Sequence, residues 1–466
     1  MKESILGTEK ISKLIRKFSI PCVISMVVAA LYNIVDQIFI GWSEAGAYGN
    51  AATNIVYPAT VFALGIALLI GDGAAANFSL SLGQGRKDKA EKFIGNGLVA
   101  LIIAAVVFCA AGFLFKNQIL AIFGADPAEE LCYKYANDYY KIICSGFIFY
   151  MIGQGLNASI RADGAPGFAM AATLAGAITN LIGDPLLIFG FGLGIKGAAY
   201  ATVAGQIVTF GMSIVYLFRS RNFKLTKDSM RIRGNILGKI LPLGLASLIV
   251  QLSIVIIIAV NNNMLTKYGY VTYASTGEAF GAVTPLAVVG IVMKVFGIVV
   301  STVIGISLGG QPILGFNMGA GNVDRVKETI QVITRTVLIV GAAAFLIFEL
   351  APGAVIALFG VNNGPEYMEY ANLCIRIFLG GIILTCYIKS AAVILQAMGN
   401  SVKSTVLALM RDVIVFVPAT LIIGTLTQNI VSMLWAALIS DVVSGVVAFV
   451  FVSGEIRKYQ KLMEER

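Results

Sequence analysis

Twelve apolar runs of membrane-spanning length recur along this chain of 466 residues. Each run is close to the 20 or so residues that a tilted transmembrane helix needs. The chain is 58% hydrophobic and 13% charged, with a mean hydropathy of +0.86, which exceeds what the core of a water-soluble domain requires. The sequence therefore predicts an all-α integral membrane protein with twelve transmembrane helices. We place them near residues 15–40, 54–80, 93–115, 136–158, 166–190, 195–218, 236–260, 278–306, 328–350, 368–392, 403–424 and 430–453.

The composition excludes several kinds of site. The chain has no His, which excludes metal sites with His ligands and proton relays through imidazole. Its six Cys show no CxxC spacing, so we expect buried thiols rather than a disulfide framework or a metal cluster. We expect no cofactor.

Lys and Arg concentrate at both termini and in the connections that follow every second predicted helix. The richest connections hold Arg86, Lys87, Lys89 and Lys92 after the second helix, and Arg219, Arg221, Lys224, Lys227, Arg231, Arg233 and Lys239 after the sixth. By the positive-inside rule, both termini are cytoplasmic and the chain is a multi-pass protein of the plasma (inner) membrane. The formal charge of +9 reflects this bias, and we expect the lipid bilayer, not nucleic acid, as the partner. The basic N-terminus is not read as a signal peptide, because the apolar run after it is too long.

The two halves of the chain repeat each other. Three pairs of segments correspond at matching places: Ser81–Lys89 with Asn317–Arg325, Ala121–Gly124 with Ala357–Gly360, and Gly164 with Gly399. Because six helices return the chain to the side where it began, the halves have parallel topology and are related by an axis along the membrane normal.

We therefore predict two pseudo-symmetric lobes of six helices. The N-lobe covers residues 1–218, a basic cytoplasmic linker covers 219–239, and the C-lobe covers 240–466. A cavity between the lobes is the expected substrate path.

Asp36 is a carboxylate inside an apolar segment, residues 30–41. An Asp in a transmembrane helix costs a few kcal/mol even on the milder insertion scales, so it faces a polar interior and marks an ion or substrate path. Tyr32 and Asn33 lie four and three residues before Asp36 and share its helix face. We predict substrate or accessory roles for both.

A second polar group lies at Asn180 and Asp184, which share a helix face. Pro185 has no amide hydrogen and frees the carbonyl of Leu181. Thr202 lies at similar depth and adds a hydroxyl. These oxygens suit Na⁺ or a proton-coupled network, so the expected coupling ion is Na⁺ or H⁺, with no metal beyond Na⁺ at this site. The alternative is that both Asp side chains are separate structural groups at helix ends.

The sequence resembles the multidrug and toxic compound extrusion (MATE) family over nearly its whole length. The matching pieces are Pro21 followed by "YNIVDQIFIG", then "IRADGAPGFAM", "NLIGDP", "QPILGFNMGAG", "QAMGNSVKS" and "LMRDVIVFVP". The resemblance implies two lobes that rock between outward-open and inward-open states and export small organic cations in exchange for Na⁺ or H⁺. We expect a monomer.

The family's N-lobe cation site maps onto Asp36, Asn180, Asp184 and Thr202. Asn157 also matches, although span counting puts it near the cytoplasmic end, roughly 15 Å from Asn180. Pro21 and Pro185 are the predicted hinges.

The C-lobe departs from the family pattern, since Gln251 stands where some members carry an acidic residue. Glu278 matches a position tied to cation recognition in some members, or is an interfacial charge at a helix N-terminus. Lys294 lies deeper, with Asp412 and Asp441 as candidate partners. Further intramembrane charges are expected to form structural pairs or to snorkel: Asp72, Arg376, Lys389 and Arg411.

Two other functions compete with drug antiport. A lipid-linked or metabolite flippase of the same superfamily would carry extra helices and a strongly basic cavity, and the sequence indicates neither. An intramembrane aspartyl protease would pair Asp36 with Asp72 or Asp184. Its glycine-aspartate signature is incomplete here, because Ile70 and Ile182 replace the first glycine. We expect no enzyme, while the coupling ion and the substrate stay open.

Overall fold

The computed structural model describes residues 5–123, 130–220, 223–272, 278–357 and 365–464, and within these ranges its regular structure is entirely helical. The first half contains α1 (Ile5–Thr8), α2 (Ile11–Trp42), α3 (Gly46–Gly83), α4 (Lys87–Leu114), α5 (Lys116–Ile122), α6 (Glu130–Ala162), α7 (Pro166–Pro185), η1 (Leu186–Gly190) and α8 (Ile195–Leu217). The second half contains α9 (Lys227–Met230), α10 (Gly234–Thr272), α11 (Glu278–Ala320), α12 (Val323–Leu350), α13 (Pro352–Ala357), α14 (Pro365–Phe378), α15 (Ile382–Ala397), α16 (Ser401–Leu409), η2 (Met410–Val415), α17 (Phe416–Thr427), α18 (Ile430–Met433) and α19 (Trp435–Glu464).

The number of membrane-spanning helices agrees with the prediction. In the described residues, 11 helices are long and apolar enough to cross a membrane, or up to 12 if one bent pair counts as a single span. The bent pair is Tyr367–Phe378 and Ile382–Ala397, which meet at 47° within the span predicted at 368–392. The predicted all-α membrane fold is confirmed.

Several helices run beyond the apolar windows that predicted them. The clearest case is α11, which continues to Ala320, well past the predicted end at residue 306. Gly309, Gly310 and Gln311 end the apolar run, yet all three are buried because α2 packs on this part of α11. Hydropathy marks the apolar layer, whereas packing decides where the helix ends.

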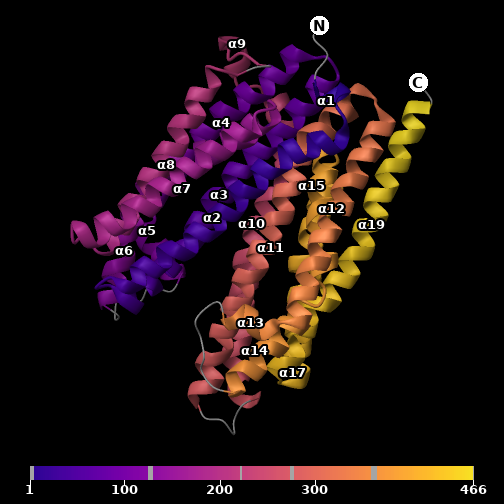
Figure 1. Cartoon of the computed structure of the whole chain (residues 1–466). Coiled ribbons are helices and arrows are strands. Elements are labelled where there is room, and N and C mark those ends of the chain that lie inside the picture. Colours follow the sequence, from indigo (N-terminus) through magenta and orange to yellow (C-terminus); the bar gives the residue numbers. More distant parts are fainter. Residues whose placement is uncertain (1–4, 124–129, 221–222, 273–277, 358–364, 465–466) are drawn as a thin grey trace.

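The helices form two groups that lie together at one end of the molecule and diverge at the other (Figure 1). One group contains α2–α8, in indigo to magenta, and the other contains α10–α19, in red to yellow. Both termini and α9 lie at the end where the groups meet. The predicted cytoplasmic orientation of that end stays a prediction.

At this end, helices of the two groups approach each other at glycines. α3 packs on α10 and α11, and α2 packs on α11. A Cβ atom at Gly244 would overlap the carbonyl oxygen of Leu69, and one at Gly319 would overlap that of Leu80. Small residues let transmembrane backbones come this close, and the resulting van der Waals contact stabilises the pair.

The repeat is visible in the backbone of the connections. Gly85 and Gly321 have φ of +73° and +79°, and Gly164 and Gly399 have φ of +86° and +82°. This left-handed region favours glycine and ends helices. Corresponding connections therefore turn in the same way. The remaining predicted pair, Ala121–Gly124 with Ala357–Gly360, includes residues 124 and 358–360, which lie outside the described residues.

The segment predicted as a linker is folded against α4. Asn96 donates to the carbonyl of Ser229 at 2.9 Å and accepts from the amide of Arg233 at 2.8 Å. Lys92 pairs with Asp228 at 3.4 Å. α10 begins at Gly234, inside the range 219–239. The predicted lobe boundaries stay a prediction.

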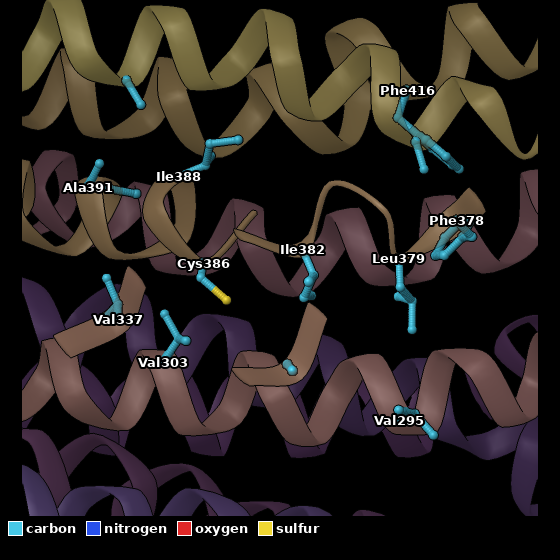
Figure 2. Close-up of a cluster of buried hydrophobic side chains, with 14 of the residues drawn as sticks. Val295, Val303, Val337, Phe378, Leu379, Ile382, Cys386, Ile388, Ala391 and Phe416 are labelled. Atoms are coloured by element: carbon cyan, nitrogen blue, oxygen red, sulfur yellow. The ribbon is translucent and has the colours of Figure 1, made fainter. Parts of the chain in front are cut away.

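The second group has its own apolar core (Figure 2). Val303, Val337 and Cys386 lie close together in it, and Leu379 and Ile382 flank the break between α14 and α15. All six cysteines of the chain are buried and free. This agrees with the expectation of structural thiols.

We predict that Gly244→Ala destabilises the protein because the new methyl group meets the backbone of α3. Overpacking of this kind costs about 1–3 kcal/mol, so the melting temperature of the purified protein should fall by several degrees. Gly211→Ala in α8 is the control, since nothing lies within 4 Å of a Cβ there. Equal melting temperatures of the two variants would refute the close contact.

Candidate functional site

Four of the predicted site residues come together on α2, α7 and α8. The amide nitrogen of Asn180 donates to Oδ1 of Asp184 at 3.2 Å and to Oγ1 of Thr202 at 3.3 Å. The carboxyl group of Asp36 is within hydrogen-bonding reach of that of Asp184. We call these four residues the carboxyl cluster. It brings together helices that lie far apart in the sequence.

The carboxyl cluster has oxygen atoms without a partner. Oδ1 of Asp36 and Oδ2 of Asp184 are buried and accept no hydrogen bond from the described residues. Asp184 is 0% exposed and Asn180 is 3% exposed. Two adjacent carboxylates repel each other in a low dielectric, and a proton or a cation between them relieves that repulsion. The donors present are the hard oxygen ligands that suit Na⁺ or H⁺.

Close packing of α7 on α8 brings Thr202 to Asn180. A Cβ atom at Gly176 would lie 2.7 Å from the carbonyl oxygen of Gly205. Pro185 ends α7 directly after Asp184, and the π-helix η1 follows. Pro21 lies inside α2. The hinge roles of the two prolines stay predictions.

The sequence reasoning missed Tyr139, which lies on α6 beside the carboxyl cluster. Its hydroxyl is within hydrogen-bonding reach of Thr202 and near enough to interact electrostatically with Asp36 and Asp184. It is buried. The sequence placed it in a predicted span among other tyrosines, and only the packing of α6 on α8 distinguishes it. Asn33 lies in α2, but its side chain is outside the described residues.

A cavity of about 1270 Å³ lies between the two helix groups. We call it the central cavity. Tyr32, Asn180 and Thr202 line it, whereas Asp36 and Asp184 are not among its lining residues. The carboxylates therefore lie behind the wall of the cavity, and polar side chains connect them to it.

Asn157 lines the same cavity but has other partners. It donates to the carbonyl of Ala169 at 3.1 Å and to Thr173 at 3.2 Å, and it accepts from Arg161 at 2.5 Å. Thr173 lies about two helical turns before Asn180. Arg161 also pairs with Asp72 at 3.5 Å, and Asp72 accepts from Ser247 at 2.8 Å. Asn157 thus belongs to a polar network separate from the carboxyl cluster.

The second helix group holds a buried network of ion pairs. Lys389 pairs with Asp412 at 2.5 Å, and Arg411 pairs with Asp412 at 2.9 Å and with Asp441 at 2.8 Å. Thr385 donates to Asp441 at 2.7 Å. Arg411 and Asp412 lie in the π-helix η2. These charges are structural pairs, as the sequence predicted.

Other predicted C-lobe residues are placed as follows. Lys294 forms no ion pair with any described residue. Its two candidate partners, Asp412 and Asp441, pair with Lys389 and Arg411 instead. Gln251 and Lys294 line the central cavity. Glu278 begins α11, and its side chain is outside the described residues. Arg376 is half exposed and contacts Glu349 at 3.9 Å.

A family model matches most of the chain. The MatE model matches residues 21–186 and again residues 258–422, one segment in each half.

Curated relatives and solved structures give the same result. The chain is 24% identical over 445 residues to the multidrug export protein MepA of Staphylococcus aureus (strain MSSA476), covering 94% of this chain and 93% of that protein. It is 23% identical over 444 residues to the protein of that name from Staphylococcus haemolyticus (strain JCSC1435), covering 95% and 93%.

Two solved structures share the fold. The outward-facing conformation of a multidrug resistance MATE family transporter of the MOP superfamily superposes with a TM-score of 0.89 at 22% identity, covering 99% of both chains. A MOP superfamily transporter from Pyrococcus furiosus Vc1 (DSM3638) superposes with the same score, identity and coverage.

We predict that Arg411→Met strongly destabilises the protein, because it leaves the buried carboxylate of Asp441 without a counter-charge. Breaking a buried pair in this way costs about 3–5 kcal/mol, so most of the variant should aggregate or melt at a much lower temperature. Arg376→Met is the matched control, since the exposed pair that it removes contributes about 0–1 kcal/mol. A native-like melting temperature for Arg411→Met would contradict the structural role.

Proposed function

This chain belongs to the MatE family of membrane transporters, and from that premise we propose that it exports amphipathic, drug-like molecules in exchange for Na⁺ or H⁺. The named relatives are multidrug export proteins, and the central cavity has a volume that suits a drug-sized molecule. The family resemblance predicts small organic cations as substrates, and that part stays an expectation.

The observation that carries the coupling proposal is the pair of buried carboxyl groups with unpartnered oxygens. In our proposal, Asp36 and Asp184 bind the coupling ion, while Asn180 and Thr202 add neutral donors. Neutralising the repulsion holds α2 against α7. An ion drives transport only if its affinity differs between the two conformations of the protein, and the contact between these two helices is where we place that difference.

α2 joins this site to the contact between the two helix groups. Ser19 of α2 donates to the carbonyl of Ile306 in α11 at 2.9 Å. Pro21 lies between this contact and Asp36 and removes a backbone hydrogen bond of the helix. We propose that α2 bends at Pro21 when the ion binds, and that Pro185 together with η1 lets the end of α7 adjust.

The proposed transport cycle starts from the separation of the two helix groups at one end of the molecule. The two helix groups diverge at the end away from the termini (Figure 1), and the central cavity is lined by residues of both groups. With both termini cytoplasmic, as the positions of Lys and Arg predict, this is an outward-open state. We propose that the lobes 1–218 and 240–466 rock about the contact near the termini in a monomer of the plasma membrane.

The two competing functions have less support. Of the two pairs that the protease hypothesis named, the structure brings Asp36 close to Asp184, whereas Asp72 pairs with Arg161 and Ser247. The protease hypothesis is set aside because the chain belongs to a transporter family. For a flippase of lipid-linked substrates we expected extra helices. The described residues form 11 or 12 spans, which fits the exporter.

We predict that Asp36→Asn and Asp184→Asn each reduce ion-driven efflux by about tenfold or more, because either change removes a charge that the coupling ion must neutralise. Efflux of a fluorescent amphiphile from proteoliposomes is measured under an imposed Na⁺ gradient and then under an imposed pH gradient. The gradient that drives native efflux identifies the coupling ion.

Asp88→Asn serves as the control, since Asp88 is exposed in the first turn of α4. It should transport like the native protein. Native-rate efflux by Asp36→Asn would refute the proposed site, and the absence of efflux under both gradients would refute ion-coupled export.

A further inference from the structure

The central cavity carries charges from both helix groups. Among the described residues that line it, the acidic and basic side chains are Asp72, Arg161, Lys294, Lys389, Arg411 and Asp412. Four are basic and two are acidic. The charge offered to a substrate depends on which of them are already paired.

All but one of these charges are balanced within the protein. Asp72 neutralises Arg161 at 3.5 Å, and Asp412 neutralises Lys389 at 2.5 Å. Arg411 has Asp441 at 2.8 Å, and Asp441 is 1% exposed behind the cavity wall. Three bases are thus matched by three acids.

Lys294 is left without a counter-charge. Its side chain is exposed and lines the cavity, and no described residue forms an ion pair or a hydrogen bond with it. Glu278 begins the same helix 16 residues earlier, and its side chain is outside the described residues. An unpaired cation in a transmembrane segment is costly and marks a candidate functional site.

The acidic groups of the site are not accessible to a substrate cation. Asp72 and Asp412 already form ion pairs. Asp36 and Asp184 lie behind the wall, and the exporter proposal assigns them to the coupling ion. The ring of Phe296 lines the cavity, but the guanidinium of Arg411 lies over it at 5.0 Å, so that aromatic face already has its cation. Among the described residues that line the cavity, an organic cation, the substrate class that the family resemblance predicts, would meet Lys294 and no free carboxylate.

We propose that the substrates are amphipathic molecules with an anionic group, such as a carboxylate, sulfonate or phosphate, and that Lys294 binds this group. Apolar and aromatic side chains line the same cavity and receive the rest of the molecule: Met26, Tyr57, Tyr150 and Met293. An ammonium group with three donors suits an anion without fixing its geometry. This inference rests on the proposed function as an exporter and names its substrate class.

The test compares three dansyl amides that differ only in the head group: a carboxymethyl anion, a trimethylammonium-ethyl cation and a neutral methyl group. Binding to the purified protein is measured by fluorescence anisotropy, without any ion gradient. We expect the native protein to bind the anion about tenfold or more tightly than the cation, a difference of about 1.4 kcal/mol.

Variants identify the residue responsible. Lys294→Met keeps the length of the side chain and should lose the preference for the anion, whereas Lys294→Arg keeps the charge and should retain it. Lys116→Met is the control, since Lys116 on α5 is not among the residues that line the cavity. All variants should melt at the native temperature. If Lys294→Met is destabilised, the proposal is tested by the anion preference of the native protein and of Lys294→Arg.

The outcomes separate this inference from the exporter proposal. Preference of the native protein for the cation, retention of the anion preference in Lys294→Met, or no binding of any probe would each overturn the anionic substrate class. If the anion binds through Lys294 but no gradient drives its efflux from proteoliposomes, the exporter proposal fails instead. Gradient-driven efflux of the cation, unaffected by Lys294→Met, would support export and refute the role of Lys294.

Discussion

The high cost of an uncompensated charge in a low-dielectric interior organises the polar part of this protein. Transmembrane carboxylates and bases are expensive unless each finds a partner. Arg411 forms ion pairs with both Asp412 and Asp441, and Arg161 forms one with Asp72. These pairs link helices that could otherwise rotate freely in an apolar environment. Among the described charges that line the central cavity or lie directly behind its wall, Lys294 and the carboxylates Asp36 and Asp184 form no ion pair, and these are the groups to which we assign function.

The carboxylates of the carboxyl cluster and Lys294 carry charges of opposite sign and lie in different places. The two carboxylates of the carboxyl cluster lie behind the cavity wall, and we assign the small coupling ion to them, whereas we assign the drug-sized molecule to the cavity. Lys294 lies on the opposite helix group and faces the cavity itself. An arrangement of this kind separates the ion from the substrate, so that the two ligands act on each other through the position of α2 rather than by direct contact.

In this proposal, the contact between the two helix groups near the termini links the position of α2 to the conformation of the whole protein. Gly244 and Gly319 let backbones of the two groups touch, and α2 belongs to this contact at Ser19 and to the ion site at Asp36. Close backbone packing has few intermediate positions, because a small displacement either keeps or loses the van der Waals contact. This favours two distinct conformations over a continuous range.

The class of protein, the number of spans, the repeat and the intramembrane carboxylates can be predicted from the sequence, because each of these depends on local composition or on spacing along the chain. Asn180 and Asp184 share a face by their four-residue spacing, and Gly85 and Gly321 mark matching connections that the backbone confirms. Which charges form pairs depends on how the helices pack in the folded protein. Hydropathy shows neither how a helix is rotated about its axis nor which helix lies next to it. The sequence therefore could not show that Asp412 forms its ion pair with Lys389 and not with Lys294. It also could not show that Tyr139 lies beside Thr202. Ion pairs between helices depend on how the helices pack. The role that can be assigned to Lys294 therefore depends on which side chains of other helices lie next to it.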